Sequence, residues 1–240
     1  MKATGIALIM AAVLCVVVAP ARADTVIYSD LGSGSTYESS SGWLVVSYQS
    51  VANPFVVPVG PGFDLTQLDV GVTWAGGTNA ATIELFTDSG GRPGTLIPSA
   101  TWTLSNLPGF NSSSIQPSQT ISGISSITLS GGTQYWLAAF PGDSSASDYW
   151  NFNNTSQVGT LALSSDGGTT WTPHSNDTLG AFDVLGTPLS GPLVPEPSSL
   201  LLFGTGILGV IGMGLYKNES PDGVGTGLRT FHVLGPPKKA

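Results

Sequence analysis

The chain has 240 residues, with 7 Lys+Arg against 15 Asp+Glu, and its formal net charge is −8 at pH 7. Charged residues make up only 9% of it, which excludes a coiled coil, and glycine does not recur at every third position, which excludes a collagen. An acidic chain with so few bases cannot neutralise a run of phosphates, so we expect no nucleic-acid partner.

The first 23 residues have the pattern of a secretory signal peptide. Lys2 precedes a long apolar run, and Ala21 and Ala23 occupy the −3 and −1 positions of a cleavage site. We therefore predict a signal peptide over residues 1–23 that is cut after Ala23, with a retained membrane helix as the alternative. Cys15 is the only cysteine and lies inside this segment, so the exported chain would have no disulfide and no cysteine-bound metal.

Residues 24–186 are predicted to form one mainly β domain, an antiparallel, jelly-roll-like β-sandwich. Apolar and polar residues alternate in short runs, as they do in strands with one buried face, at 68–74, 83–85, 101–104 and 127–129. The run 135–140 is continuously apolar, which predicts a central strand buried on both faces. Paired glycines between the runs, at 76–77, 90–91, 131–132 and 167–168, can supply the positive φ of tight turns.

The segment from Ser164 to Trp171 fits the pattern Ser-x-Asp-x-Gly-x-Thr-Trp, which is called an Asp-box. The carboxylate of Asp166 would accept hydrogen bonds from turn amides, Gly168 would supply the strained φ, and Trp171 would pack beneath the turn, with Thr170 just before it. One copy in a chain too short for a β-propeller predicts a structural hairpin turn and not a catalytic element.

A segment near residue 150 interleaves aromatic and amide side chains. Aromatic faces stack on sugar rings and amides bond sugar hydroxyls, so Tyr149, Trp150 and Phe152 are candidate glycan contacts. The alternative for these rings is packing in the core, which is the usual role of large aromatic side chains.

Residues suited to metal binding or catalysis are few and scattered. Asp143 and Asp148 could offer oxygen ligands to calcium, but no complete calcium-binding loop surrounds them, so a solvated loop is favoured and no metal site is predicted. His174 could act as the base of a serine nucleophile, but the sequence has no Gly-x-Ser-x-Gly motif to supply that serine. Glu38 and Glu84 are the only glutamates before the linker, and the sequence does not place them together. We predict no catalytic residue and no cofactor.

The C-terminal part has a different composition. A Gly/Pro-rich linker is expected over residues 187–197, and 198–216 is a run of 19 residues without a charge. At 1.5 Å per residue it would span about 28 Å as a helix, which suits the hydrocarbon core of a membrane. We predict a transmembrane helix there, with Lys217 on the cytoplasmic side and a disordered tail over 217–240. A buried helix of a soluble domain is the alternative.

The linker ends in Val194-Pro195-Glu196-Pro197. With the apolar run and Lys217 behind it, this tetrapeptide resembles a PEP-CTERM sorting signal. The resemblance implies an exopolysaccharide-producing Gram-negative source, recognition by an exosortase, and a membrane-anchored precursor that is then delivered to the cell surface or outside. The chain departs from the family pattern after Lys217, where 23 residues follow in place of a short arginine cluster.

The exported region also resembles a choice-of-anchor R domain, from about residue 26 to 185. The resemblance is carried by the segments 27–31, 40–43, 88–94, 132–137 and 179–184. Domains of this kind occur with different surface-anchoring signals, so the resemblance implies a location and no reaction.

These observations predict an exported, surface- or matrix-associated structural protein without enzymatic activity. The expected partners are the exosortase, the membrane through the C-terminal helix, and exopolysaccharide. A carbohydrate-binding module is the alternative, and a secreted hydrolase is the less favoured one.

Overall fold

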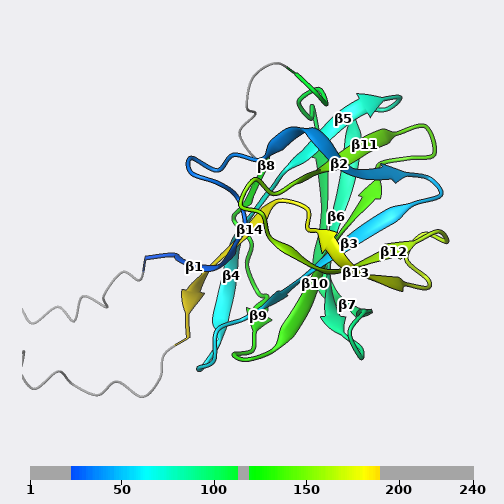
Figure 1. Cartoon of the computed structure of the whole chain (residues 1–240). Coiled ribbons are helices and arrows are strands. Elements are labelled where there is room, and N and C mark those ends of the chain that lie inside the picture. The colour runs from blue at the N-terminus through cyan, green and yellow to red at the C-terminus, as the bar shows by residue number, and fades with distance from the viewer. Residues whose placement is uncertain (1–22, 113–118, 190–240) are drawn as a thin grey trace, which may run out of the picture. The chain divides into compact units, whose positions relative to one another are not determined.

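The computed structural model describes residues 23–112 and 119–189 (Figure 1). The described residues form fourteen strands and no helix, and every pairing between strands is antiparallel, so the predicted mainly β, antiparallel fold is confirmed. Most of the predicted signal peptide, the sorting tetrapeptide, the predicted helix over 198–216 and the tail over 217–240 lie outside the described residues.

The strands form three sheets. The six-stranded sheet has the order β13-β12-β3-β10-β6-β7, with β3 (Ser50–Val56), β6 (Ala80–Asp88), β7 (Pro93–Ser105), β10 (Gln134–Pro141), β12 (Val158–Ser164) and β13 (Thr172–Thr178). The five-stranded sheet has the order β1-β14-β4-β8 with β9 also paired to β4, and contains β1 (Thr25–Ser29), β4 (Phe63–Val70), β8 (Gln119–Ser122), β9 (Thr128–Leu129) and β14 (Phe182–Pro188). The three-stranded sheet has the order β2-β11-β5, with β2 (Glu38–Val46), β5 (Val72–Gly76) and β11 (Ser147–Phe152).

Strand β10 is the central strand that its continuous apolar run predicts. It lies between β3 and β6, and residues 135–139 are all buried. Alternate side chains serve two separate clusters: Leu137 and Ala139 belong to the main core, whereas Trp136 and Ala138 belong to a smaller cluster on the other face of the sheet. Because both faces are covered, no polar residue is required at alternate positions.

Residues 68–74 do not form the single half-buried strand that their alternation predicts. The chain leaves β4 at Val70 and enters β5 of another sheet at Val72. Gly71 between them donates its N–H to the carbonyl of Ala181 and accepts a hydrogen bond from the N–H of Asn151. A Cβ at Gly71 would lie 3.1 Å from that of Ala181, so the close approach that lets the strand change sheets suits glycine.

The main hydrophobic core draws residues from all three sheets. Its members include Leu68, Val70, Val184, Val51, Leu85, Leu137, Val45 and Val72. The ring of Phe182 connects the sheets, because its centroid lies 6.0 Å from that of Phe55 in β3 and 5.9 Å from that of Trp150 in β11. Tyr28 of β1 stacks on the same ring at 4.7 Å.

Turns between the strands fall at the paired glycines, as predicted from the sequence. Each of the four glycine pairs contributes at least one residue with positive φ, with the largest value, 87°, at Gly168. Strand β14 ends at Pro188, two residues inside the segment 187–197, and the N–H of Leu189 still bonds the carbonyl of Gly62. Among residues 23–112 and 119–189, no helix is long and apolar enough to cross a membrane.

Candidate functional site

The Asp-box residues form the turn that joins β12 to β13. Ser164, the last residue of β12, donates its hydroxyl to Oδ1 of Asp166 at 2.8 Å and accepts the N–H of Gly168 at 2.8 Å. Asp166 in turn accepts the N–H of Thr170 at 2.9 Å and its hydroxyl at 2.7 Å. These bonds hold the pKa of the Asp166 carboxyl down at about 2. The carboxylate is therefore engaged in shaping the turn.

Trp171 follows the turn and is buried. It packs edge-on against Phe86 and Phe140, with ring centroids 6.1 and 6.0 Å away, on the face of the six-stranded sheet opposite the main core. A Cβ at Gly168 would lie 2.8 Å from the ring of Phe140, so a side chain there would displace this packing. The turn therefore packs directly on the smaller cluster.

Asp166→Ala should lower the Tm by a few degrees, about 2–4 °C for a domain of this size, because three turn hydrogen bonds are lost. Asp177→Ala in β13 is the matched control and should leave the Tm unchanged, because no side-chain hydrogen bond holds Asp177 within the described residues. Thermal unfolding by circular dichroism measures both. An Asp166→Ala protein with the parent's Tm would show that the carboxylate does not shape the turn.

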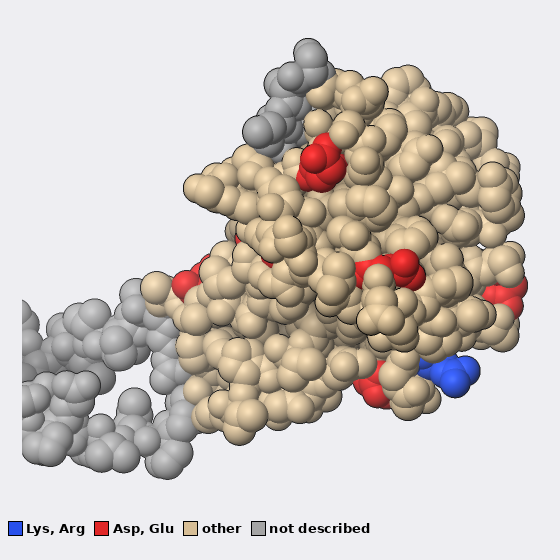
Figure 2. Space-filling model, viewed as in Figure 1, with Lys and Arg blue, Asp and Glu red and all other residues tan. Residues whose placement is uncertain are grey.

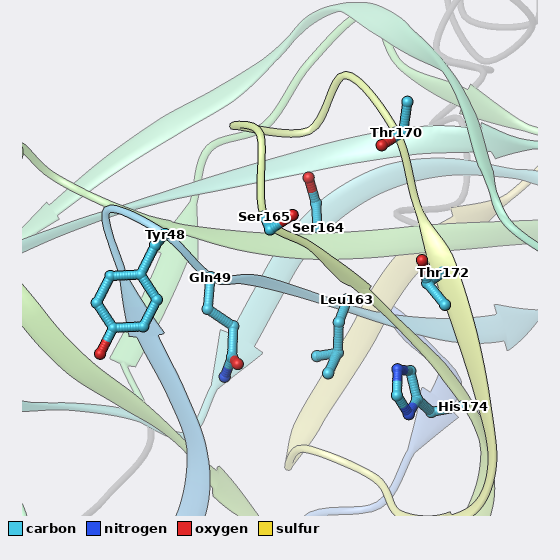
Figure 3. A pocket seen from close by; sticks show the side chains of 8 residues that line it. All are labelled: Tyr48, Gln49, Leu163, Ser164, Ser165, Thr170, Thr172 and His174. Atoms are coloured by element: carbon cyan, nitrogen blue, oxygen red, sulfur yellow. The ribbon is translucent and has the colours of Figure 1, made fainter.

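A hollow of about 250 Å³ lies beside this hairpin (Figure 3). It is lined by Tyr48 and Gln49 from the β2–β3 turn, by Leu163, Ser164 and Ser165 at the end of β12, and by Thr170, Thr172 and His174 on the returning chain. Tyr48, Gln49, Leu163 and His174 lie in a row across the view. Two hairpins that are far apart in the sequence thus contribute to one surface.

The hollow is polar but carries no charged side chain in its lining. The side-chain amide of Gln49 donates a hydrogen bond to the carbonyl of Leu44 at 2.7 Å, and the hydroxyl of Ser164 donates one to Asp166 in the turn. Tyr48 is 66% exposed, and it was not among the candidate residues of the sequence. No sequence motif of the kind considered above contains Tyr48, which lies in the turn between β2 and β3.

The structure corrects one of the three candidate glycan contacts. Trp150 is fully buried in the main core, where its indole N–H donates to the carbonyl of Ala181 at 3.0 Å, so it cannot stack on a sugar. Tyr149 alternates to the other face of β11 and stacks on Phe110 at 3.9 Å, which occupies one side of its ring. Phe152 packs edge-on against Trp43 at 5.8 Å. Both rings are half-buried.

Phe152 does line a second hollow, which is wider and holds about 530 Å³. Its walls are Glu38, Ser40 and Ser41 of β2 and the segment around Asn153, with Val158 and Thr178. Asn153 is committed to the fold, because its amide bonds the carbonyls of Gln157 and Leu179 at 2.8 Å each. Glu38 accepts the hydroxyl of Ser40 at 2.5 Å and its N–H at 3.0 Å, and these two hydrogen bonds lower the pKa of that carboxyl.

Asp143 and Asp148 differ sharply in their surroundings. Asp143 is exposed, and its oxygens accept hydrogen bonds from the hydroxyl of Thr78 and from Ser145 and Ala146, which hold its pKa at about 2. Asp148 is fully buried in β11, and neither carboxylate oxygen has a hydrogen-bond partner. Burial, with a smaller effect from the charge of Asp143, raises its pKa to about 7. In the described part of the chain, no group of three or more His, Cys, Asp or Glu could hold a metal ion.

The residues considered for catalysis lie apart in the fold. Glu38 begins β2 of the three-stranded sheet, whereas Glu84 lies on β6 of the six-stranded sheet and accepts a hydrogen bond from Thr101 at 3.3 Å. His174 lies on β13 opposite Leu161, and within residues 23–112 and 119–189 no hydrogen bond joins it to a serine or a carboxylate. Within the described part of the chain, no hydrogen bond joins Glu38, Glu84 and His174 to one another.

Comparison with models of known protein families finds a match outside the described residues. Residues 193–215 match the family model of the PEP-CTERM protein-sorting motif. The motif implies export, recognition by an exosortase, and sorting to the cell surface or the extracellular space. No curated protein matches the chain.

Proposed function

We propose that the protein is a non-enzymatic structural component of the cell surface or of an exopolysaccharide matrix, delivered there through its sorting motif. The observation that carries the proposal is the order of the parts, an antiparallel β domain followed by a PEP-CTERM motif at residues 193–215. A domain with this signal is destined for the outside. The source would be a Gram-negative bacterium that makes exopolysaccharide, and the precursor would be anchored by the helix over 198–216.

The finer fold belongs to the same proposal. We take the sheets to pack as a jelly-roll-like sandwich of the choice-of-anchor R kind, since residues of the five-stranded and six-stranded sheets share one core around Phe182. Such a domain has a protected interior and a largely uncharged surface. Of the Lys and Arg residues only Arg92 falls in the described part, and most of the face in Figure 2 carries neither sign of charge.

We propose that the protein has no catalytic activity because its candidate carboxylates are hydrogen-bonded within the fold or lie in different sheets. Asp166, in the turn whose Ser164 and Thr170 line the first hollow, and Glu38, which lines the second, are each engaged in local hydrogen bonds. A glycosidase needs two carboxylates that flank one bond, and the glutamates belong to different sheets. A structural protein needs only a stable domain and a signal that directs it to its location.

Fractionation of an exopolysaccharide-producing host tests the proposal. The full chain should be found in the surface or extracellular matrix fraction when the host makes an exosortase, and in the inner membrane when the exosortase gene is deleted. A chain without residues 193–215 is the control and should miss the matrix in both hosts. Equal distribution of the full chain in the two hosts would overturn the proposal.

A further inference from the structure

We propose that the hollow beside the β12–β13 hairpin binds an uncharged polysaccharide, with Tyr48 stacking on one sugar ring and Thr172 and His174 bonding its hydroxyls. The inference rests on the proposed function, because a matrix protein works among such polymers. It assigns the binding surface to residues other than Tyr149 and Phe152, whose rings are half-buried against other aromatic rings.

Tyr48 is the first reason. Six large hydrophobic side chains are exposed in the described part of the chain, and Tyr48 is the only aromatic one among them. Its backbone is fixed by the paired hydrogen bonds between Val46 and Gln49, at 2.9 and 2.8 Å. A tyrosine held on a tight turn offers a rigid apolar face with little rotational freedom to lose on binding.

The unpartnered polar groups are the second reason. Hydroxyl groups of a sugar both donate and accept hydrogen bonds, and the hydroxyls of Ser165 and Thr172 and the imidazole of His174 can pair with them. None of these three side chains makes a hydrogen bond within the described residues. Thr172 pairs with Leu163 across the hairpin, so the hydroxyl stands beside an apolar floor. This combination of polar edge and apolar floor matches the two faces of a sugar ring.

The third reason is charge. The lining contains no Asp, Glu, Lys or Arg, and the described residues as a whole contain twelve acids and one base. An anionic polymer would be repelled by this domain, and no fixed negative charge in the hollow attracts a cationic one. The volume of about 250 Å³ is below the roughly 300–1,000 Å³ of pockets that enclose a drug-sized ligand, so the hollow would hold a short part of a longer chain.

Affinity electrophoresis tests the proposal directly. The full chain, purified in a non-ionic detergent, is run in native gels that contain dextran, galactomannan, hydroxyethylcellulose or, as the anionic probe, alginate. We expect at least one of the neutral polymers to retard the protein and alginate to have no effect. Tyr48→Ala should weaken the retardation about three- to tenfold, as expected for the loss of an aromatic stack. His174→Ala should also weaken it.

Two control variants separate stacking from general damage. Tyr48→Phe keeps the ring and should keep most of the binding, whereas Val59→Ala removes a side chain that is 95% exposed outside the hollow and should bind like the parent. Retardation by none of the neutral polymers, retardation by alginate, or a Tyr48→Ala protein that binds like the parent would overturn the inference. Binding in gels by a chain that never reaches the matrix would overturn the proposed function and leave this site standing.

Discussion

Asp148→Leu should raise the free energy of unfolding at pH 8 by about 1–3 kcal/mol, the usual cost of a buried polar group without a partner. Asp148 is fully buried, and both its carboxylate oxygens are without a hydrogen bond. Its neighbours across the strands are Val45 and Trp74, so it lies among apolar side chains. Leucine has a similar shape and replaces the carboxylate without leaving a cavity.

The effect should depend on pH in a defined direction. Burial raises the pKa of Asp148 from its ordinary value of 3.8 to about 7 in the folded state. Below pH 3.8 the carboxyl is protonated in both states, and its contribution to stability is fully present. As the pH rises from about 4 to 7 the unfolded chain loses the proton first, so this contribution is lost. The gain from Asp148→Leu should therefore be smaller at pH 4, where it removes only an unpartnered neutral carboxyl, and reach its full size above pH 7.

Asp30 is the matched control for this substitution. It is also fully buried, and desolvation raises its pKa to about 7 as well. It differs in its partners, because it accepts the N–H of Phe182 at 2.6 Å and the hydroxyl of Tyr28 at 3.0 Å. Asp30→Leu leaves both donors unsatisfied and should lower the free energy of unfolding, by about 1–3 kcal/mol.

Urea unfolding of the parent and both variants between pH 4 and 8 measures these effects. Should Asp148→Leu destabilise the protein at pH 8, the carboxylate would have a partner that offsets its burial. A cation is the candidate, and repeating the titration with a chelator would then lower the stability of the parent alone. A gain that is equal at pH 4 and pH 8 would contradict the pKa assignment.

The strand pattern was readable from the sequence where one physical requirement acted alone. Residues 135–140 had to be apolar because β10 is covered on both faces, and Ile83 and Leu85 point into the core on either side of the outward Glu84. The Asp-box residues are close in sequence, so their hydrogen bonds depend on local geometry only. Local patterns of this kind need no knowledge of the rest of the fold.

The sequence did not predict the features that depend on contacts between segments far apart in the chain. Nothing local marks Gly71 as the residue where the chain changes sheets, because the reason is the approach of Ala181 and Asn151. Trp150 resembled an exposed aromatic among amides, yet the neighbouring Asn151 is also buried, with Thr73 donating to its side-chain oxygen at 2.6 Å. Tyr48 gains its importance only because the β12–β13 hairpin lies beside its turn.

Substitution of Glu196 should have the largest effect on the fate of the protein. The residue lies inside the segment 193–215 that matches the PEP-CTERM motif. A membrane anchor needs only apolar length, which residues 198–216 supply without any acid, and a glutamate drawn into the bilayer would cost energy. A carboxylate before a helix does favour the helix dipole, by about 0.3–1 kcal/mol, but aspartate would serve equally well there. We therefore expect a protein partner to recognise Glu196 through its specific side chain.

In a host that makes an exosortase, Glu196→Asp and Glu196→Gln should both accumulate as an unprocessed form of higher mass in the inner membrane. The processed fraction should fall at least about tenfold, because a pocket built to bond one carboxylate rejects a group that cannot reach its donors. Immunoblots of membrane and extracellular fractions measure it, with Ser199→Ala as a control that should be processed like the parent. The same substitutions in a chain without residues 219–240 remove any effect of the segment after Lys217, which the family pattern lacks. If both Glu196 variants are delivered like the parent in that shorter chain, the tetrapeptide serves only as a linker, and the sorting information must lie in the apolar run.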